Sequence, residues 1–262
     1  LDRAFGSTAQ ADDLQADGRA HAANLTVAAL MNHDAENSLS SAAMTPRGRL
    51  RVDVPSPLAR LILVPALPAF HARYPDIQID MGVSDREVDL IGDNVDCVLR
   101  GGQITDQSLI ARHVGDLQIG VYVAPSYVER LGAPAHPREL QNTDHCIVGF
   151  LSSRTSKIDP LVLCSENERI EITGNYVLAV DDGNACLEAG LVGLGVIALP
   201  NYMAAAHQAV GALIPLFTQW RISPMPLYLA FPPNRHVNAK LRVFIDWIVE
   251  LMEQHVPIAN NQ

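Results

Sequence analysis

The stretch GRLRVDVPSPLARLILVPALPAFHARYPDIQIDM, residues 48–81, decides the fold class of this chain. Its first residues alternate between polar and apolar, as in a β-strand, until Pro55-Ser56-Pro57 interrupts the pattern. Apolar residues then recur at helical spacing from Leu63 to Tyr74, and Ile77 resumes a period of two. Such a strand–helix–strand unit predicts two parallel strands and an α/β sheet. The helix would begin at the carboxyl end of the first strand, where open α/β sheets bind ligands.

The composition fits a folded protein of one large or two small domains. The chain has 262 residues, 48% of them hydrophobic, which is enough for a sizeable core. No apolar run approaches the roughly 18 residues of a transmembrane helix. The start, Leu1-Asp2-Arg3, lacks Met and shows no secretory signal, and the missing Met indicates that Leu1 is not a natural start.

The charge argues against nucleic-acid binding by this polypeptide. Its net charge is −10, so binding would require a segregated basic patch. Arg47, Arg49 and Arg51 are close together, but on a strand they would share one solvated face. Residues 1–46 contain two arginines, no lysine and six acidic residues, so this end should repel DNA.

The cysteines predict a reducing compartment, which we take to be the cytoplasm. All four are far apart and none forms a CxxC pair: Cys97, Cys146, Cys164 and Cys186. We therefore expect no disulfide framework. Cys97 and Cys164 lie in apolar runs and are expected to be core thiols.

The remaining elements divide the chain into three parts. Residues 17–42 have a narrow stripe of mostly Ala at helical spacing, which suits helix–helix contact. A short helix over 85–92, a strand over 95–100 and a strand over 117–124 follow the first unit. A second lobe would contain a helix from Pro125, a strand over 145–150, and an antiparallel pair at 161–164 and 170–172. A helix over 182–191 and then a turn and a buried strand within 193–200 would complete it. A strand over 227–231 and a helix over 241–248 would return to the first lobe.

Several short motifs follow one another along the chain. They are Leu14-Gln15-Ala16-Asp17-Gly18-Arg19-Ala20, the opening stretch, Asp89-Leu90-Ile91, Asp96-Cys97-Val98-Leu99-Arg100-Gly101-Gly102, Ser108-Leu109-Ile110-Ala111-Arg112, and Gly190-Leu191-Val192-Gly193-Leu194-Gly195-Val196 before Leu199-Pro200. Together they resemble the linker helix and effector-binding domain of LysR-type transcriptional regulators. The likeness extends from about Leu14 to Trp247.

The resemblance implies a fold and a way of working. Two Rossmann-like α/β lobes, similar to a type 2 periplasmic binding protein, would be joined by two crossing strands and preceded by a linker helix. Residues 1–46 would be a remnant of the DNA-binding domain with the linker helix, residues 47–124 and 221–262 lobe 1, and residues 125–220 lobe 2. Too few residues precede the linker motif for the family's winged helix-turn-helix. We therefore expect a sensor that binds no DNA alone and associates as a dimer or tetramer through the helix at 63–73 and its flanking strand.

Two helix starts are the candidate binding site. One follows Val54 at Ser56-Pro57, and the other is Asp182-Gly183-Asn184; free N–H groups there attract anions. The resemblance implies that both border an interlobe cleft, where Ser56 would donate a hydroxyl hydrogen bond. The expected ligand-binding residues are Pro55, Ser56, Pro57, Arg100, Gly101, Gly102, Phe150, Leu151, Ser152, Asp182, Gly183 and Asn184, with Ser153 beside them.

A simpler alternative is that Ser56 and Asp182 only cap their helices. For Ser56 the sequence favours neither ligand contact nor helix capping. For Asp182 capping is favoured, because its negative charge opposes an anionic ligand, and Asp181 beside it argues further against a carboxylate effector.

Nothing in the sequence predicts catalysis, a metal or a cofactor. Asp144-His145-Cys146 contains a thiol and a base, but neighbours on a strand point to opposite faces. Gly190, Gly193 and Gly195 precede a strand rather than follow one, unlike a dinucleotide motif. The histidines lack the spacing of metal ligands: His113, His207, His236 and His255.

Two other functions keep the same two-lobed architecture. A solute-binding protein for transport would need export, and it has no place for the Ala-striped helix. An enzyme built on the same cleft would need paired carboxylates, a metal cluster or a nucleophile with its base, and none is evident.

Overall fold

The computed structural model describes residues 45–85, 95–104, 106, 108–142, 144–152, 155–233, 238–256 and 258. The expected DNA-binding remnant and linker helix, the motif at Asp89, nearly all of the short helix over 85–92, Ser153 and His236 lie outside this described part.

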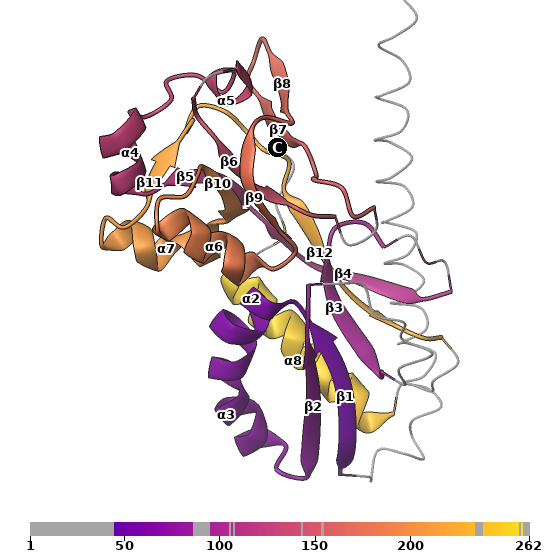
Figure 1. Ribbon diagram of the computed structural model, residues 1–262. Coiled ribbons are helices and arrows are strands. Elements are labelled where there is room, and N and C mark those ends of the chain that lie inside the picture. Colours follow the sequence, from indigo (N-terminus) through magenta and orange to yellow (C-terminus); the bar gives the residue numbers. More distant parts are fainter. Residues whose placement is uncertain are drawn as a thin grey trace, which may run out of the picture.

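The first sheet has five strands in the order β2-β1-β3-β12-β4 (Figure 1). They are β1 (Gly48–Val54), β2 (Ile77–Val83), β3 (Cys97–Gly101), β4 (Ile110–Leu117) and β12 (Met225–Phe231). β1 is parallel to β2 and β3, whereas β12 is antiparallel to β3 and β4. The parallel unit predicted from residues 48–81 is confirmed, and so is the late strand that returns to this sheet.

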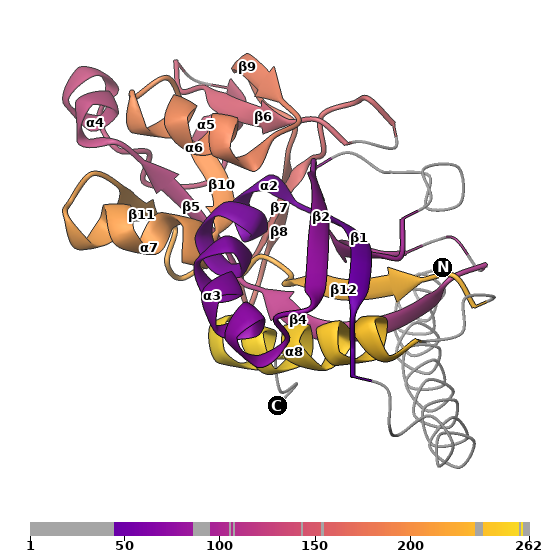
Figure 2. The same cartoon turned by 90° about the horizontal axis from the view of Figure 1, so that it is seen from below.

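The helix after β1 begins at Ser56, the start that the sequence predicted. It runs from α2 (Ser56–Leu58) through a π-helical turn, η2 (Ala59–Leu63), into α3 (Val64–Arg73). Pro65 comes just after this π-helical turn. Proline has no N–H to donate, and its ring clashes with the preceding turn of a regular α-helix, so a wider turn at this point accommodates it. The buried Phe70 packs its ring 4.8 Å from that of Trp247 in α8 (Ala239–His255), so both helices cover one face of the sheet (Figure 2).

The second sheet is built around β5 (Ile119–Val123), which pairs antiparallel with β10 (Ile197–Pro200) and β11 (Ile214–Leu216). A bridge between Ile147 and Val196 adds β6 (Ile147–Phe150), and β6 is parallel to β9 (Tyr176–Val180). Because β5 belongs here, the chain leaves the first sheet at Gln118 rather than after residue 124, where we expected the boundary. The chain returns between β11 and β12.

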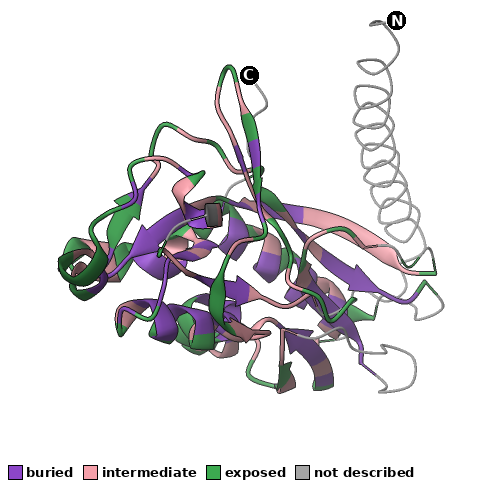
Figure 3. Cartoon of the chain, turned by 45° about the horizontal axis from the view of Figure 1, so that its top comes forward, coloured by how far each residue is buried: buried purple, intermediate pink, exposed green. Residues whose placement is uncertain are grey.

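Four helices and a hairpin complete the second lobe: α4 (Pro125–Leu131), α5 (Glu139–Asn142), α6 (Gly183–Leu191), α7 (Asn201–Ala209), and β7 (Leu161–Cys164) with β8 (Arg169–Ile172). The hairpin, α4 and α6 match the sequence predictions, whereas α7 and β11 were not predicted. Buried residues concentrate in the strands and on the inner sides of the helices, and they form separate cores in the two lobes (Figure 3).

The cysteines are unpaired, as expected. Cys97 and Cys186 are buried, but Cys164 is half-buried rather than a core thiol, because it lies at the end of a hairpin strand. In the described part of the chain, no helix is long and apolar enough to span a bilayer.

Candidate functional site

The carboxyl ends of parallel strands from both sheets meet between the lobes. In the first sheet these ends are Val54, Val83 and Gly101, and in the second they are Phe150 and Val180. The helix that starts at Ser56 follows one set, and α6 follows the other. The beginning of α2 contacts α6 where the lobes come together (Figure 1). Open α/β sheets bind ligands at such edges.

One carboxylate joins the two helix starts. Asp85, which follows β2, accepts the Ser56 N–H at 2.8 Å through Oδ1 and the Gly183 N–H at 2.7 Å through Oδ2. Ser56 belongs to the first lobe and Gly183 to the second. A side chain of the protein therefore occupies the position that an anionic ligand would take between two helix N-termini.

Side chains also meet across the lobes at this point. The Asn184 amide donates to Ser56 Oγ at 2.7 Å, and Arg60 donates to the Asn184 oxygen at 3.2 Å. Gly183 lies so close to Pro57 that an added Cβ would stand 2.7 Å from the proline Cγ. The lobes can approach this closely only because residue 183 has no side chain.

The capping alternative is correct for Asp182 and incorrect for Ser56. Asp182 Oδ1 accepts the Ala185 N–H at 2.8 Å, which is an N-cap bond. The N-cap of α2 is Pro55, and the Ser56 hydroxyl bonds Asn184 instead of a helix amide. Ser56 is thus available to the contact between the lobes.

The environment of Asp85 disfavours its negative charge. Burial raises the pKa of this carboxyl above 3.8, and Asp182 raises it further, while the two backbone hydrogen bonds and Arg100 oppose the shift. Burial, with the nearby Asp85 charge, also raises the pKa of the Tyr202 hydroxyl. The carboxylate is therefore held by two hydrogen bonds in a place where ionisation is unfavourable.

Arg100, one of the expected ligand-binding residues, has a structural role in the first lobe. Its guanidinium forms an ion pair with Asp53 of β1, and it donates to the Leu99 carbonyl at 3.0 Å. The two ion-paired side chains are only 14% and 9% exposed. Arg100 therefore holds β3 to β1 beneath the edge of the sheet.

The two glycines after Arg100 have different surroundings. Gly101 is exposed, and a Cβ there would lie 2.6 Å from the Met225 sulfur. Gly102 has a φ of +89°, in the left-handed region, which favours glycine.

The predicted residues of the second-lobe wall line up beside α6. Leu151 donates its N–H to the Val180 carbonyl at 2.7 Å, and Ser152 donates to the Lys157 carbonyl at 2.8 Å. The Phe150 side chain packs against the core beneath α6. These residues are fixed within the second lobe, next to the strand that leads into Asp182.

Sequence reasoning missed Asp53, Arg60, Asp85 and Tyr202. Asp85 carried a usable signal, because it follows a parallel strand at the edge that also holds Ser56. Asp53 was also visible as a carboxylate in a strand whose neighbours on both sides are apolar.

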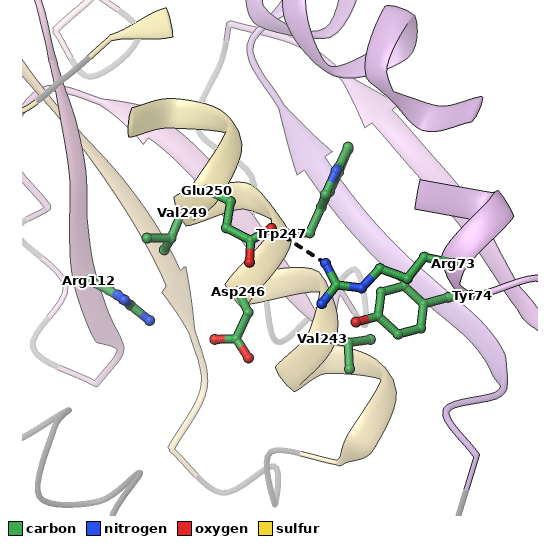
Figure 4. A pocket seen from close by; sticks show the side chains of 8 residues that line it. All are labelled: Arg73, Tyr74, Arg112, Val243, Asp246, Trp247, Val249 and Glu250. Carbon is green, nitrogen blue, oxygen red and sulfur yellow. Dashed lines mark hydrogen bonds and ion pairs between the residues drawn. The ribbon is translucent and has the colours of Figure 1, made fainter. Parts of the chain in front are cut away.

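A separate pocket lies on the outer side of the first lobe. It has a volume of about 280 Å³ and lies between the end of α3 and α8 (Figure 4). Arg73 and Glu250 form an ion pair of 3.5 Å at its rim. The other lining residues are Tyr74, Arg112, Val243, Asp246, Trp247 and Val249. None of the predicted site residues lines it. Among the residues described, no group of three His, Cys, Asp or Glu side chains could hold a metal.

Known proteins match this chain over most of its length. A family model described as the LysR substrate binding domain matches residues 43–253. An HTH-type transcriptional repressor of Pseudomonas aeruginosa is 32% identical over 256 residues, which cover 98% of this chain and 80% of the relative. The HTH-type regulator CrgA of Neisseria meningitidis serogroup C is 30% identical over 217 residues, covering 82% of this chain and 71% of CrgA.

Solved structures agree with the fold. The regulatory domain of CrgA, a LysR-type regulator from Neisseria meningitidis, has a TM-score of 0.70 at 28% identity and covers 78% of this chain and 98% of that chain. Full-length AphB, a virulence activator of Vibrio cholerae, has a TM-score of 0.68 at 25% identity and covers 85% and 76%. The two-lobed fold is confirmed, and a transport protein is not favoured. This chain belongs to the LysR-type transcriptional regulators and carries their effector-binding domain.

Proposed function

We propose that a small-molecule effector binds where the strand ends of the two lobes face each other. The observation that carries the proposal is the pair of helix starts, at Ser56 and Gly183, brought to a single point between the lobes. Amides, a hydroxyl and the Asn184 side chain converge there. Such convergence is typical of small-molecule sites in α/β proteins.

Effector binding would change the balance between two arrangements of the lobes. A ligand shifts such an equilibrium only through its different affinity for the two states. The two-lobed fold supports a rocking motion about the crossing strands. In the effector site we place Pro55, Ser56, Pro57, Gly101, Gly102, Phe150, Leu151, Ser152, Gly183 and Asn184, with Arg100 and Asp182 in supporting positions.

We further propose that a second copy of the chain is a partner. Exposed apolar side chains lie on both lobes: Leu61 and Val64 in the first helix, Val83 at the end of β2, and Tyr176 and Val177 in β9. β2 and β9 are edge strands of the described sheets. Exposed apolar groups on edge strands favour association. This surface includes the helix that the sequence predicted, although Leu63 itself is buried.

We assign DNA contact to the helix-turn-helix for which the curated relatives are named, rather than to the residues described. We place the protein in the cytoplasm, as the free thiols and the family support.

A thermal-shift screen of the wild-type chain against organic acids, amino acids, aromatics and polyols tests the effector site. A ligand that binds only the folded state raises the Tm with concentration. Ser56→Ala should weaken any hit, whereas Ser165→Ala, in the β7–β8 turn, should not. Equal affinities of the wild type and Ser56→Ala would remove Ser56 from the site.

A further inference from the structure

Asp85 is the residue whose contacts cross between the lobes most directly. Its two carboxylate oxygens accept N–H groups that lie 29 and 98 residues away in sequence, one from each lobe. The side chains of Ser56 and Asn184 close the same contact at 2.7 Å. A single carboxylate thus completes the start of a helix in each lobe.

We propose that Asp85 is a built-in ligand that latches the two lobes together, and that an effector carrying a carboxylate acts by taking its place. The Asp181 and Asp182 charges argued against such an effector in the sequence, but the Asp85 carboxylate is accommodated beside them by the two amides. The inference rests on the proposed effector site and specifies the chemistry of its central position. While the latch is closed, the Ser56 and Gly183 amides are already bonded to Asp85, so an added anion cannot bond these two amides.

The latch is suited to opening. Its hydrogen bonds are charge-assisted, which makes them strong individually. Burial and the neighbouring Asp182 nevertheless make the ionised carboxyl unfavourable, as its raised pKa indicates, while Arg100 only partly compensates. Among the described residues, the Tyr202 hydroxyl also lies close enough to Asp85 to respond to its charge. A ligand with a carboxylate of its own could exchange with Asp85 and let that side chain return to water.

Amide exchange measured by NMR on the whole chain at pH 7 tests the latch without any effector. In Asp85→Ala the Ser56 and Gly183 amides should both exchange about ten- to a hundredfold faster, the loss expected for a charged hydrogen bond. The control is Asp76→Ala, which removes an equal charge from the exposed turn before β2 and should change neither amide. Unchanged exchange in Asp85→Ala would overturn the proposal, as would a change at Ser56 alone.

A second variant covers the case in which Asp85→Ala does not fold. Gly183→Ala retains Asp85 but places a methyl group 2.7 Å from the Pro57 Cγ, so the lobes must separate. Exchange at the amide of residue 183 should then accelerate, because separation takes it away from Asp85, whereas the Ser56 amide belongs to the same lobe as Asp85 and should keep its protection. Protection of residue 183 equal to that of the wild type would contradict the latch.

Acetate tests whether the carboxylate can be exchanged. Added to Asp85→Ala, sodium acetate should slow exchange at Ser56 and Gly183, whereas sodium chloride at equal ionic strength should not. Acetate should have no such effect on the wild type. If acetate leaves both amides of the variant unprotected, the exchange mechanism is wrong. The effector screen on the wild type is independent of these results, so the two proposals can fail separately.

Discussion

Removing Arg100 should damage the fold before it damages any binding. Arg100 and Asp53 form a largely buried ion pair with side-chain exposures of 14% and 9%. Arg100→Met leaves the Asp53 carboxylate buried without its partner, and breaking such a pair costs about 3–5 kcal/mol. At roughly 2–4 °C per kcal/mol for a domain of this size, the Tm should fall by about 6–20 °C.

A double-mutant cycle followed by circular dichroism measures this effect. Asp53→Asn with Arg100→Met should recover most of the loss, because no uncompensated charge remains. The control is Arg49→Met, whose pair with Asp80 is 61% and 38% exposed and should contribute less than about 1 kcal/mol. Wild-type Tm in Arg100→Met, or single effects that simply add in the double variant, would refute the structural role and return Arg100 to the list of ligand contacts.

Three further outcomes can be checked. Burial raises the pKa of Asp85 above 3.8. The contribution of the protonated side chain to the free energy of unfolding is therefore complete below pH 3.8, and it is lost as the pH rises through the raised pKa. The difference in Tm between the wild type and Asp85→Asn should therefore become smaller as the pH rises from 3 to 7. A difference that grows with pH would show that folding lowers the pKa of Asp85 instead. Burial raises the pKa of the Cys186 thiol to about 12, so mass spectrometry should find the half-buried Cys146 alkylated by iodoacetamide well before Cys186. Equal rates would mean that Cys186 is accessible. Val177→Lys puts a charge on the exposed edge strand β9 and should lower the molar mass seen by light scattering if this surface self-associates; an unchanged mass would exclude it.

The sequence predicted what depends on local patterns. Alternation in β1 and helical spacing around Phe70 were sufficient for the parallel unit, because each period matches one kind of element. Asp182-Gly183-Asn184 predicted the start of α6, because an N-cap bond spans only three residues. The position of Ser56 at the carboxyl end of β1 followed from the strand–helix–strand order.

Contacts between residues far apart along the chain could not be predicted from the sequence. The partners of Asp85 lie far away along the chain, and no spacing rule connects them. The ion pair between Arg100 and Asp53 could not be predicted, because the two residues become neighbours only when β1 and β3 pair. The assignment of β5 to the second sheet likewise depends on β10 and β11, which come much later in the chain.

The two crossings between the lobes leave the first sheet side by side. β4 and β12 remain paired as far as Leu117 and Met225, immediately before the chain passes into or out of the second lobe. Two adjacent connections act as a hinge, because they resist sliding and separation of the lobes but allow bending between them. The main motion expected of the two lobes is therefore a change in the single angle between them. Under the proposed function, a few contacts distant from these two strands would then decide which angle between the lobes is populated.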